Sequence, residues 1–258
     1  MSESTTAPVA LVTGSGKRRV GNTVLRRLAE RGFDTVLHYR SSTNEAEATA
    51  QDIRTAGGRC EAIQADVSVE TDVVRMFQTI RDRFGRLDVV VNCASVWEPK
   101  PLEETTAEDV ERQFRINTLG TFLCCREAGK IMAAQPEGGL IVLVGDWAVA
   151  RPYLNYAAYF ASKGAIPTLT RMFAVELASR NPRIRVNCIE PGPVMLPDHL
   201  RPSERRYAVE GTLLKREGSP ENVAQAVLAF WDNDYVTGVC LPVDAGRRLA
   251  AYDADRPA

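Results

Sequence analysis

The sequence predicts an α/β fold of Rossmann type: a single-domain, doubly wound parallel sheet of about seven strands with helices on both faces. Short runs of almost continuously apolar residues alternate with helical patterns along the chain, as expected for parallel strands buried on both faces. A glycine-bearing turn after the first run, Val9–Val12, leads directly into a helix. The length of 258 residues suits one large α/β domain.

Each strand is predicted from a short apolar run that stops at glycine or a polar residue. The expected strands, in order, are Val9–Val12, Thr35–Tyr39, Cys60–Gln64, Leu87–Val91, Leu140–Gly145, Ile184–Ile189 and Val239–Val243. Helices are predicted where apolar residues recur at helical spacing, often up to a terminating glycine. They are expected at Gly21–Arg31, Asn44–Ala56, Val69–Phe84, Ala107–Arg115, Thr118–Ala134, Tyr156–Ser179 and Glu221–Trp231.

Three segments stand apart from this alternation. Met1–Ala7 is polar and is expected to be disordered, which leaves residues 8–258 for the folded domain. Met195–Lys215 is charged and aperiodic, and a loop of this length predicts a lid over a site. Pro167 falls inside the long helix Tyr156–Ser179, where it cannot donate to the carbonyl of Lys163, so we expect a kink there or a tertiary contact that compensates.

Composition excludes several classes of function. A formal net charge of -1 argues against nucleic acid as a partner. Six cysteines without paired spacing and two distant histidines argue against a metal site. No apolar run approaches the roughly 20 residues of a membrane span, and the polar start lacks the apolar core of a signal peptide. We therefore expect a cytoplasmic protein with reduced thiols.

The sequence Tyr159-Phe160-Ala161-Ser162-Lys163, with Asp146 thirteen residues upstream, carries the strongest chemical signal. Tyr159 and Lys163 share one face of a helix at i and i+4, and a nearby ammonium lowers the pKa of a phenol. Such a phenol can exchange a proton with a reduced carbonyl or imine.

The turn from Thr13 to Gly21 predicts a nucleotide site, because its glycines admit a pyrophosphate to a helix N-terminus. The second strand is followed by Arg40 and Ser41, where an NAD-binding fold needs an acidic residue. Arginine and a hydroxyl suit a 2′-phosphate, so NADPH/NADP+ is the expected cofactor.

These motifs, in this order from Val9 to Leu249, resemble the short-chain dehydrogenase/reductase family. The family loop usually reads TGxxxGxG, and Arg19 stands here in place of its middle glycine. The resemblance implies catalytic roles for Asp146, Tyr159 and Lys163, and for Asn117, which would hold a water that passes protons to the lysine. It implies a homotetramer, and cofactor contacts from Gly14, Arg19, Val20, Gly21, His38, Tyr39, Arg40, Ser41, Asp66, Val67, Asn92, Ala94, Ser95, Tyr159, Lys163, Pro191, Gly192 and Val194.

Asp146 stands where the family usually has serine. An ionised aspartate can only accept hydrogen bonds, so it suits a substrate that presents N–H donors or a ring nitrogen to be protonated. In this respect the chain resembles the pteridine reductases, including the dihydromonapterin-reductase-like branch, which also carry an aromatic residue at the place of Trp97. The resemblance implies a small-molecule substrate contacted by Arg19, Ser95, Trp97, Asp146 and Tyr159, with hydride transfer to a C=N of a pterin or dihydrofolate.

Two alternatives remain open at this point. One is an NADPH-dependent carbonyl reductase, acting on 3-ketoacyl or sugar substrates, with Asp146 protonated in an apolar pocket. The other is a cofactor-binding sensor without catalysis, against which the presence of Tyr159, Lys163 and Asn117 argues.

Overall fold

A computed structural model describes residues 7–198 and 200–250, so most of the predicted disordered N-terminus lies outside the described part. Seven strands form one sheet in the order β3-β2-β1-β4-β5-β6-β7, with every neighbouring pair parallel, which confirms the predicted fold class. The strands are β1 (Val9–Thr13), β2 (Asp34–Tyr39), β3 (Cys60–Gln64), β4 (Val89–Asn92), β5 (Gly139–Val144), β6 (Ile184–Pro191) and β7 (Cys240–Val243).

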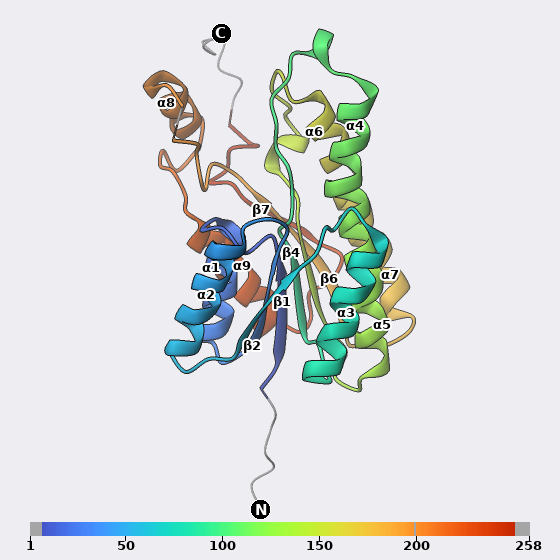
Figure 1. The fold of residues 1–258 in the computed structure, drawn as a ribbon. Helices are drawn as coiled ribbons and strands as arrows, with labels where there is room; N and C mark the ends of the chain where they lie inside the picture. The colour runs from blue at the N-terminus through green and yellow to red at the C-terminus, as the bar shows by residue number, and fades with distance from the viewer. Residues whose placement is uncertain (1–6, 199, 251–258) are drawn as a thin grey trace, which may run out of the picture.

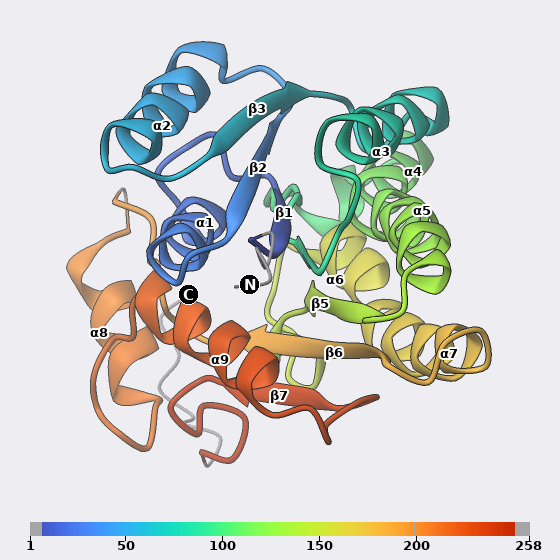
Figure 2. The ribbon, with the colours of Figure 1, turned by 90° about the horizontal axis from the view of Figure 1, so that it is seen from below.

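Helices cover both faces of the sheet (Figures 1 and 2). One face is covered by α1 (Val20–Glu30), α2 (Thr43–Thr55) and α9 (Pro220–Asp232), and the other by α3 (Glu70–Phe84), α5 (Gly120–Ala134) and α7 (Ile166–Ala178). The remaining elements are α4 (Ala107–Phe114), α6 (Ala157–Lys163), α8 (Pro202–Glu210), the 3-10 turns η1 (Leu102–Glu104) and η3 (Trp147–Val149), and the π-helical turn η2 (Arg115–Leu119).

The alternation of side chains along β1 shows why the strands are continuously apolar. Val9 and Leu11 belong to the core beneath α3, α5 and α7, whereas Ala10 and Val12 belong to the core beneath α1, α2 and α9. All four are essentially inaccessible to solvent. Successive side chains of a strand point to opposite faces, and here both faces are covered, so neither set can be polar.

The predicted helix Tyr156–Ser179 is wrong as a single element: the structure divides it into α6 and α7. Pro167 is the second residue of α7, within its first turn. The first N–H groups of a helix have no partner inside the helix, so proline sacrifices no bond there. The intervening Gly164 and Ala165 keep right-handed helical dihedrals but belong to neither helix, so the proline stands next to a helix boundary.

The structure differs from the prediction in two further segments: the boundary between the helices predicted at Ala107–Arg115 and Thr118–Ala134, and the loop predicted at Met195–Lys215. The turn η2 joins α4 and α5 without a break, so the two predicted helices form one continuous rod. The stretch Met195–Lys215 contains a regular helix, α8, which begins at Pro202 as helices often do.

This topology creates a switch point at the carboxyl ends of the strands. The chain continues from β1 to β2 on one side, whereas β4 lies on the other side of β1, and ligands of such sheets bind at this switch point. Among the described residues, no helix combines the length and apolar character needed to cross a bilayer.

Candidate active site

Asp146, Tyr159 and Lys163 lie together at the carboxyl end of β5. Asp146 precedes η3, and its Oδ1 accepts from the N–H of Ala148 at 2.8 Å. The hydroxyl of Tyr159 donates to the Oδ2 of Asp146 at 2.7 Å. One turn further along α6, the Nζ of Lys163 donates to the carbonyl of Val144 at 2.8 Å. The three predicted catalytic groups are therefore adjacent in space, and Tyr159 and Lys163 are both buried.

Burial determines the protonation of these three groups. It raises the pKa of Asp146 above its usual range, although the bond from Tyr159 opposes the effect. Burial, followed by the nearby charge of Asp146, raises the pKa of Tyr159 well above its usual range. Burial lowers the pKa of Lys163.

The sequence predicts a lowered pKa for Tyr159, the opposite of the shift in the structure, because the helical spacing makes Lys163 the partner of the phenol. In the structure the ammonium is bonded to Val144 and the phenol is bonded to the carboxyl group of Asp146. The phenol of Tyr159 therefore retains its proton, which is the state required of a proton donor to substrate.

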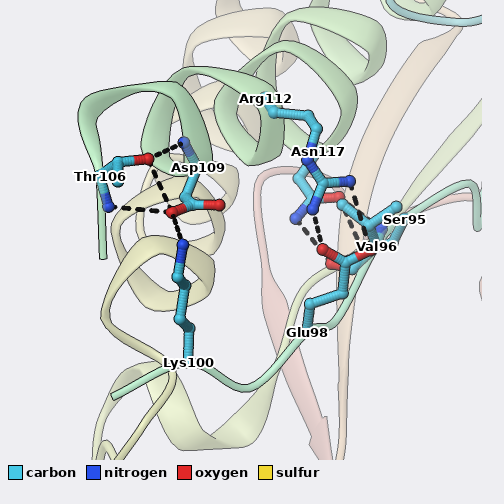
Figure 3. Close-up of polar contacts among 8 residues, drawn as sticks. All are labelled: Ser95, Val96, Glu98, Lys100, Thr106, Asp109, Arg112 and Asn117. Atoms are coloured by element: carbon cyan, nitrogen blue, oxygen red, sulfur yellow. Dashed lines mark hydrogen bonds and ion pairs between the residues drawn. The ribbon is translucent and has the colours of Figure 1, made fainter. Parts of the chain in front are cut away.

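Asn117, within η2, bonds to the loop after β4 (Figure 3) and also to Ser162 of α6, so it clamps the two together. Its Oδ1 accepts from the N–H of Val96 at 2.8 Å and the hydroxyl of Ser95 at 2.9 Å. Its Nδ2 donates to the carbonyl of Val96 at 3.0 Å and to the hydroxyl of Ser162 at 2.9 Å. All four positions of the amide are occupied. The water relay implied for Asn117 stays a prediction, and its side chain acts here as a support.

Two ion pairs extend this support along the same loop (Figure 3). Lys100 pairs with Asp109, which also forms a capping box with Thr106 at the start of α4. Glu98 pairs with Arg112, one turn later on α4. The loop after β4 is thus attached to the helix from which η2 continues.

The turn after β1 packs closely against the loop after β4. Gly14 has a φ of +66°, and a Cβ at this position would lie 2.8 Å from the Cα of Ala94. A Cβ on Gly21 would lie 2.9 Å from the carbonyl oxygen of Gly14. The N–H of Ala94 donates to the Oγ1 of Thr13 at 3.1 Å. Glycine is required at Gly14 and Gly21 because any side chain would separate the two loops.

His38 has a structural role, and its predicted contact with the cofactor stays a prediction. Its Nδ1 accepts from the N–H of Gly14 at 3.0 Å, and its Nε2 lies 3.1 Å from the carbonyl of Ala65, to which it donates. The ring is only 2% exposed, and burial lowers its pKa to about 4. A neutral imidazole therefore ties the glycine turn to the end of β3.

Three other predicted cofactor contacts also have side chains in the core. Tyr39 and Val194 pack beneath α1, α2 and α9, and Val67 packs beneath the opposite helices against Gly120. A dinucleotide could meet these three residues only through their backbone. The sequence did not distinguish them because the last residues of buried strands and the first residues of the following loops are equally apolar.

The remaining predicted contacts lie at the carboxyl edge of the sheet. Asp66 accepts from the hydroxyl and N–H of Ser68, and Asn92 is buried at the end of β4. Gly192 follows β6, where its N–H donates to Val243 at 2.9 Å. Partly or fully exposed predicted contacts at this edge are Gly14, Arg19, Val20, Arg40, Ser41, Asp66, Ala94, Ser95, Pro191 and Gly192.

Trp97 belongs to an aromatic cluster that the sequence analysis did not identify. Its ring stacks on Tyr156 with centroids 4.6 Å apart and planes at 20°, and its Nε1 donates to the hydroxyl of Tyr153 at 2.9 Å. The ring of Tyr156 in turn lies 6.4 Å from that of Tyr159, edge to face. The recurrence of tyrosine every third residue from Tyr153 to Tyr159 is the signal that could have revealed the cluster.

Comparisons with known proteins agree with this geometry. Residues 15–248 match a family described as Enoyl-(Acyl carrier protein) reductase. The chain is 36% identical over 253 residues to a short-chain type dehydrogenase/reductase of Picea abies, covering 93% of this chain and 92% of the relative. It is 33% identical to a tetrahydroxynaphthalene reductase of Pyricularia oryzae, covering 95% and 91%. A solved blue fluorescent protein from a metagenomic library, in complex with NADPH, superimposes with a TM-score of 0.84 at 34% identity, covering 93% and 97%.

Proposed function

The chain belongs to the short-chain dehydrogenase/reductase family, and from this premise we propose that it is an NADPH-dependent reductase of carbonyl compounds. The observation that carries the proposal is the bond between Tyr159 and Asp146, a carboxyl group whose pKa burial raises. A neutral carboxyl group can donate to a ketone oxygen, as a serine hydroxyl does. The similarity to a tetrahydroxynaphthalene reductase supports the same choice.

The residues at the switch point fit a dinucleotide. Arg19 is at the N-cap of α1 and its side chain makes no capping bond to the described residues, so the N–H groups of the first turn remain for a pyrophosphate. The Oδ1 of Asn92 is buried at the end of β4 without a partner among the described residues. Arg40 and Ser41 are exposed after β2, where a 2′-phosphate would lie. When bound, NADPH supplies a hydride to the substrate carbon.

The proposed chemistry assigns proton donation to Asp146 and Tyr159. Burial raises the pKa of both groups, and both face the same end of β5. One proton passes to the carbonyl oxygen as the carbon is reduced, which converts a ketone to an alcohol. Lys163 holds the strand end through Val144 and contributes positive charge beside the developing alkoxide.

The aromatic cluster of Trp97, Tyr153 and Tyr156 favours a flat or apolar substrate. Stacked rings beside the catalytic Tyr159 form a wall that suits another ring. Arg19 and Ser95, both exposed at the same edge, remain proposed contacts to the substrate or the cofactor phosphates.

A second candidate, reduction of a pterin-like C=N, is favoured by the aspartate itself. Asp146 in place of the usual serine, together with Trp97, is the pattern that led to this hypothesis. It requires a carboxylate that accepts from ring N–H groups, whereas burial favours the neutral acid. We therefore place it second.

One experiment separates these candidates. NADPH oxidation is measured with aromatic ketones, a 3-ketoacyl thioester, dihydrobiopterin and dihydrofolate, using the native enzyme and Asp146→Ser. For a carbonyl reductase, Asp146→Ser retains ketone turnover within about tenfold, and Tyr159→Phe abolishes it. Asp52→Asn, which changes an exposed aspartate on α2, is the control for effects of mutagenesis and purification that do not depend on Asp146.

The pH dependence gives an independent readout. If neutral Asp146 is the donor, kcat for ketone reduction falls as pH rises through its pKa, and Asp146→Ser lacks this fall. Turnover of the pterins alone, lost in Asp146→Ser, would refute the first proposal in favour of the second. Tight NADPH binding without turnover of any substrate would indicate the sensor. The homotetramer implied by the family resemblance stays a prediction that sedimentation velocity tests.

A further inference from the structure

Two cysteines face each other across the strand pair β6 and β7. Cys188 and Cys240 are direct register partners in this parallel pair. Register partners on neighbouring strands are about 4.8 Å apart at Cα, which is inside the range of about 4.4–6.8 Å that a disulfide spans. Their sulfur atoms, with a carboxylate oxygen of Glu190, all lie within 4.8 Å of one another. The proposed reductase mechanism uses none of these three side chains.

The two thiols differ in access and in surroundings. Cys188 is buried, whereas Cys240 is half-buried on β7, the outermost strand of the sheet (Figure 2). The neighbouring thiol of Cys188, followed by Arg171 and Thr170 on α7, lowers the pKa of Cys240, whereas burial and the charge of Glu190 oppose this effect. The neighbouring thiol of Cys240, together with burial, raises the pKa of Cys188 well above its usual range. Cys240, the more accessible of the two thiols, is therefore the one that a dissolved oxidant meets first, and Cys188 lies behind it.

We propose that Cys240 and Cys188 form an oxidation site that closes into a disulfide between β7 and β6. A peroxide is the oxidant. The Cys240 thiolate attacks one peroxide oxygen, the O–O bond breaks, and sulfenic acid and one water form once the leaving hydroxide takes a proton. The sulfur of Cys188 then attacks the sulfur of Cys240; its thiol proton and the leaving hydroxyl depart as a second water. Two thiols are oxidised and one peroxide is reduced.

The charges around the cluster favour this chemistry over metal binding. Glu190 is already engaged by Arg248, which also approaches Asp244. Arg171 contributes positive charge near Cys240 and Lys163 near Cys188, whereas the carboxylate of Glu190 opposes their effect on the two thiols. A divalent cation would need Glu190 to leave its partner and would face these cations, whereas a thiolate is stabilised by them.

The disulfide would also act on the candidate active site. Cys188 packs against Gly145, where a Cβ would lie 3.0 Å from its sulfur. Gly145 connects Val144, the acceptor for Lys163, to Asp146. Turning the Cys188 side chain toward Cys240 removes this packing from the segment that positions both groups, so we expect NADPH-dependent turnover to fall on oxidation.

The test uses the intact protein with a chelator and hydrogen peroxide, followed by thiol alkylation, proteolysis and mass spectrometry without reductant. We expect a peptide that joins Cys188 to Cys240, lighter by two hydrogens than the reduced pair and cleaved by dithiothreitol. In Cys188→Ala the reaction stops at the sulfenic acid of Cys240, which dimedone traps; Cys188→Ser serves if alanine impairs folding. In Cys240→Ala, Cys188 remains reduced. Cys93→Ala, a half-buried cysteine outside the pair, is the matched control.

Three outcomes overturn the inference. Cys240 sulfenic acid that persists in the native protein, without a cross-link, shows that Cys188 does not resolve it. Stoichiometric zinc binding that Cys188→Ala and Cys240→Ala both abolish assigns the cluster to a metal. Unchanged NADPH turnover in fully cross-linked protein refutes the link to the active site. The covalent readout does not depend on which substrate the enzyme reduces.

Discussion

The neutrality of His38 predicts a defined loss of stability on mild acidification. In the folded state its Nδ1 accepts from Gly14 and its Nε2 donates to Ala65, so a second ring proton would set two N–H donors against each other. Burial lowers its pKa from 6.5 to about 4. Between pH 6.5 and about 4, His38 therefore binds a proton in the unfolded chain but not in the folded chain.

The sign and size of the effect follow from this difference. Between pH 6.5 and pH 4 the unfolded state binds one more proton at His38, so the free energy of unfolding decreases as pH falls. At about 1.4 kcal/mol for each unit of pKa, the full effect is about 3 kcal/mol. Most of it, about 2 kcal/mol, is lost between pH 7 and pH 5.

Urea unfolding at pH 7, 6 and 5 measures this loss. His38→Gln replaces the imidazole with an amide that does not titrate, so the native protein should lose about 2 kcal/mol more than the variant over this range. Should the variant be too unstable to measure, the imidazole resonances of His38 give the same answer, and they should stay at their neutral positions down to pH 5. Equal pH dependence in both proteins, or titration near pH 6.5 in the folded state, would refute the reasoning.

Three further predictions concern neighbouring positions. Gly14→Ala should weaken NADPH binding about tenfold or more, because the backbone there has a positive φ and the new Cβ would collide with Ala94. Fluorescence titration with NADPH measures the affinity. An unchanged affinity would show that the two loops do not approach each other as closely as described. Pro167→Ala should change the free energy of unfolding by less than about 1 kcal/mol, because the proline is in a first turn; a gain near 3 kcal/mol would place it inside a helix. Asn117→Ala should lower the free energy of unfolding by about 2–3 kcal/mol, because the backbone N–H and carbonyl of Val96 lose their partner. Urea unfolding measures this loss, with Asn44→Ala, at an exposed site, as the control. Equal losses in the two variants would exclude the clamp.

The sheet was predictable because its strands are buried on both faces. Runs such as Val9–Val12 have no polar alternative, and the structure extends that strand by only one residue. The catalytic group was predictable for a different reason: Asp146, Tyr159 and Lys163 come from adjacent segments, so helical spacing and strand order bring them together. Sequence reasoning failed where a tertiary partner decides the outcome.

His38 and Tyr159 illustrate that failure. The sequence shows that His38 ends a strand, but only the fold shows that Gly14 and Ala65 occupy both of its nitrogens. The helical spacing places Lys163 beside Tyr159, but the carbonyl of Val144 takes its ammonium. Pro167 was expected to distort a helix because it cannot donate to the carbonyl of Lys163, whereas the structure places it in the first turn of α7.

Because of the π-helical turn η2, the number of residues from Ala107 to Ala134 matters more than their identity for the orientation of α4 relative to α5. From Ala107 to Ala134 the backbone is helical throughout, with one surplus residue accommodated in the wide turn around Asn117. Deleting any single residue of this turn would restore a uniform α-helix and rotate everything before it by about 100° relative to α5. Asn117 and the side chains of α4 could then no longer all face their present partners. Exposed positions on this rod should therefore accept many substitutions, whereas a one-residue deletion at its centre should abolish the site.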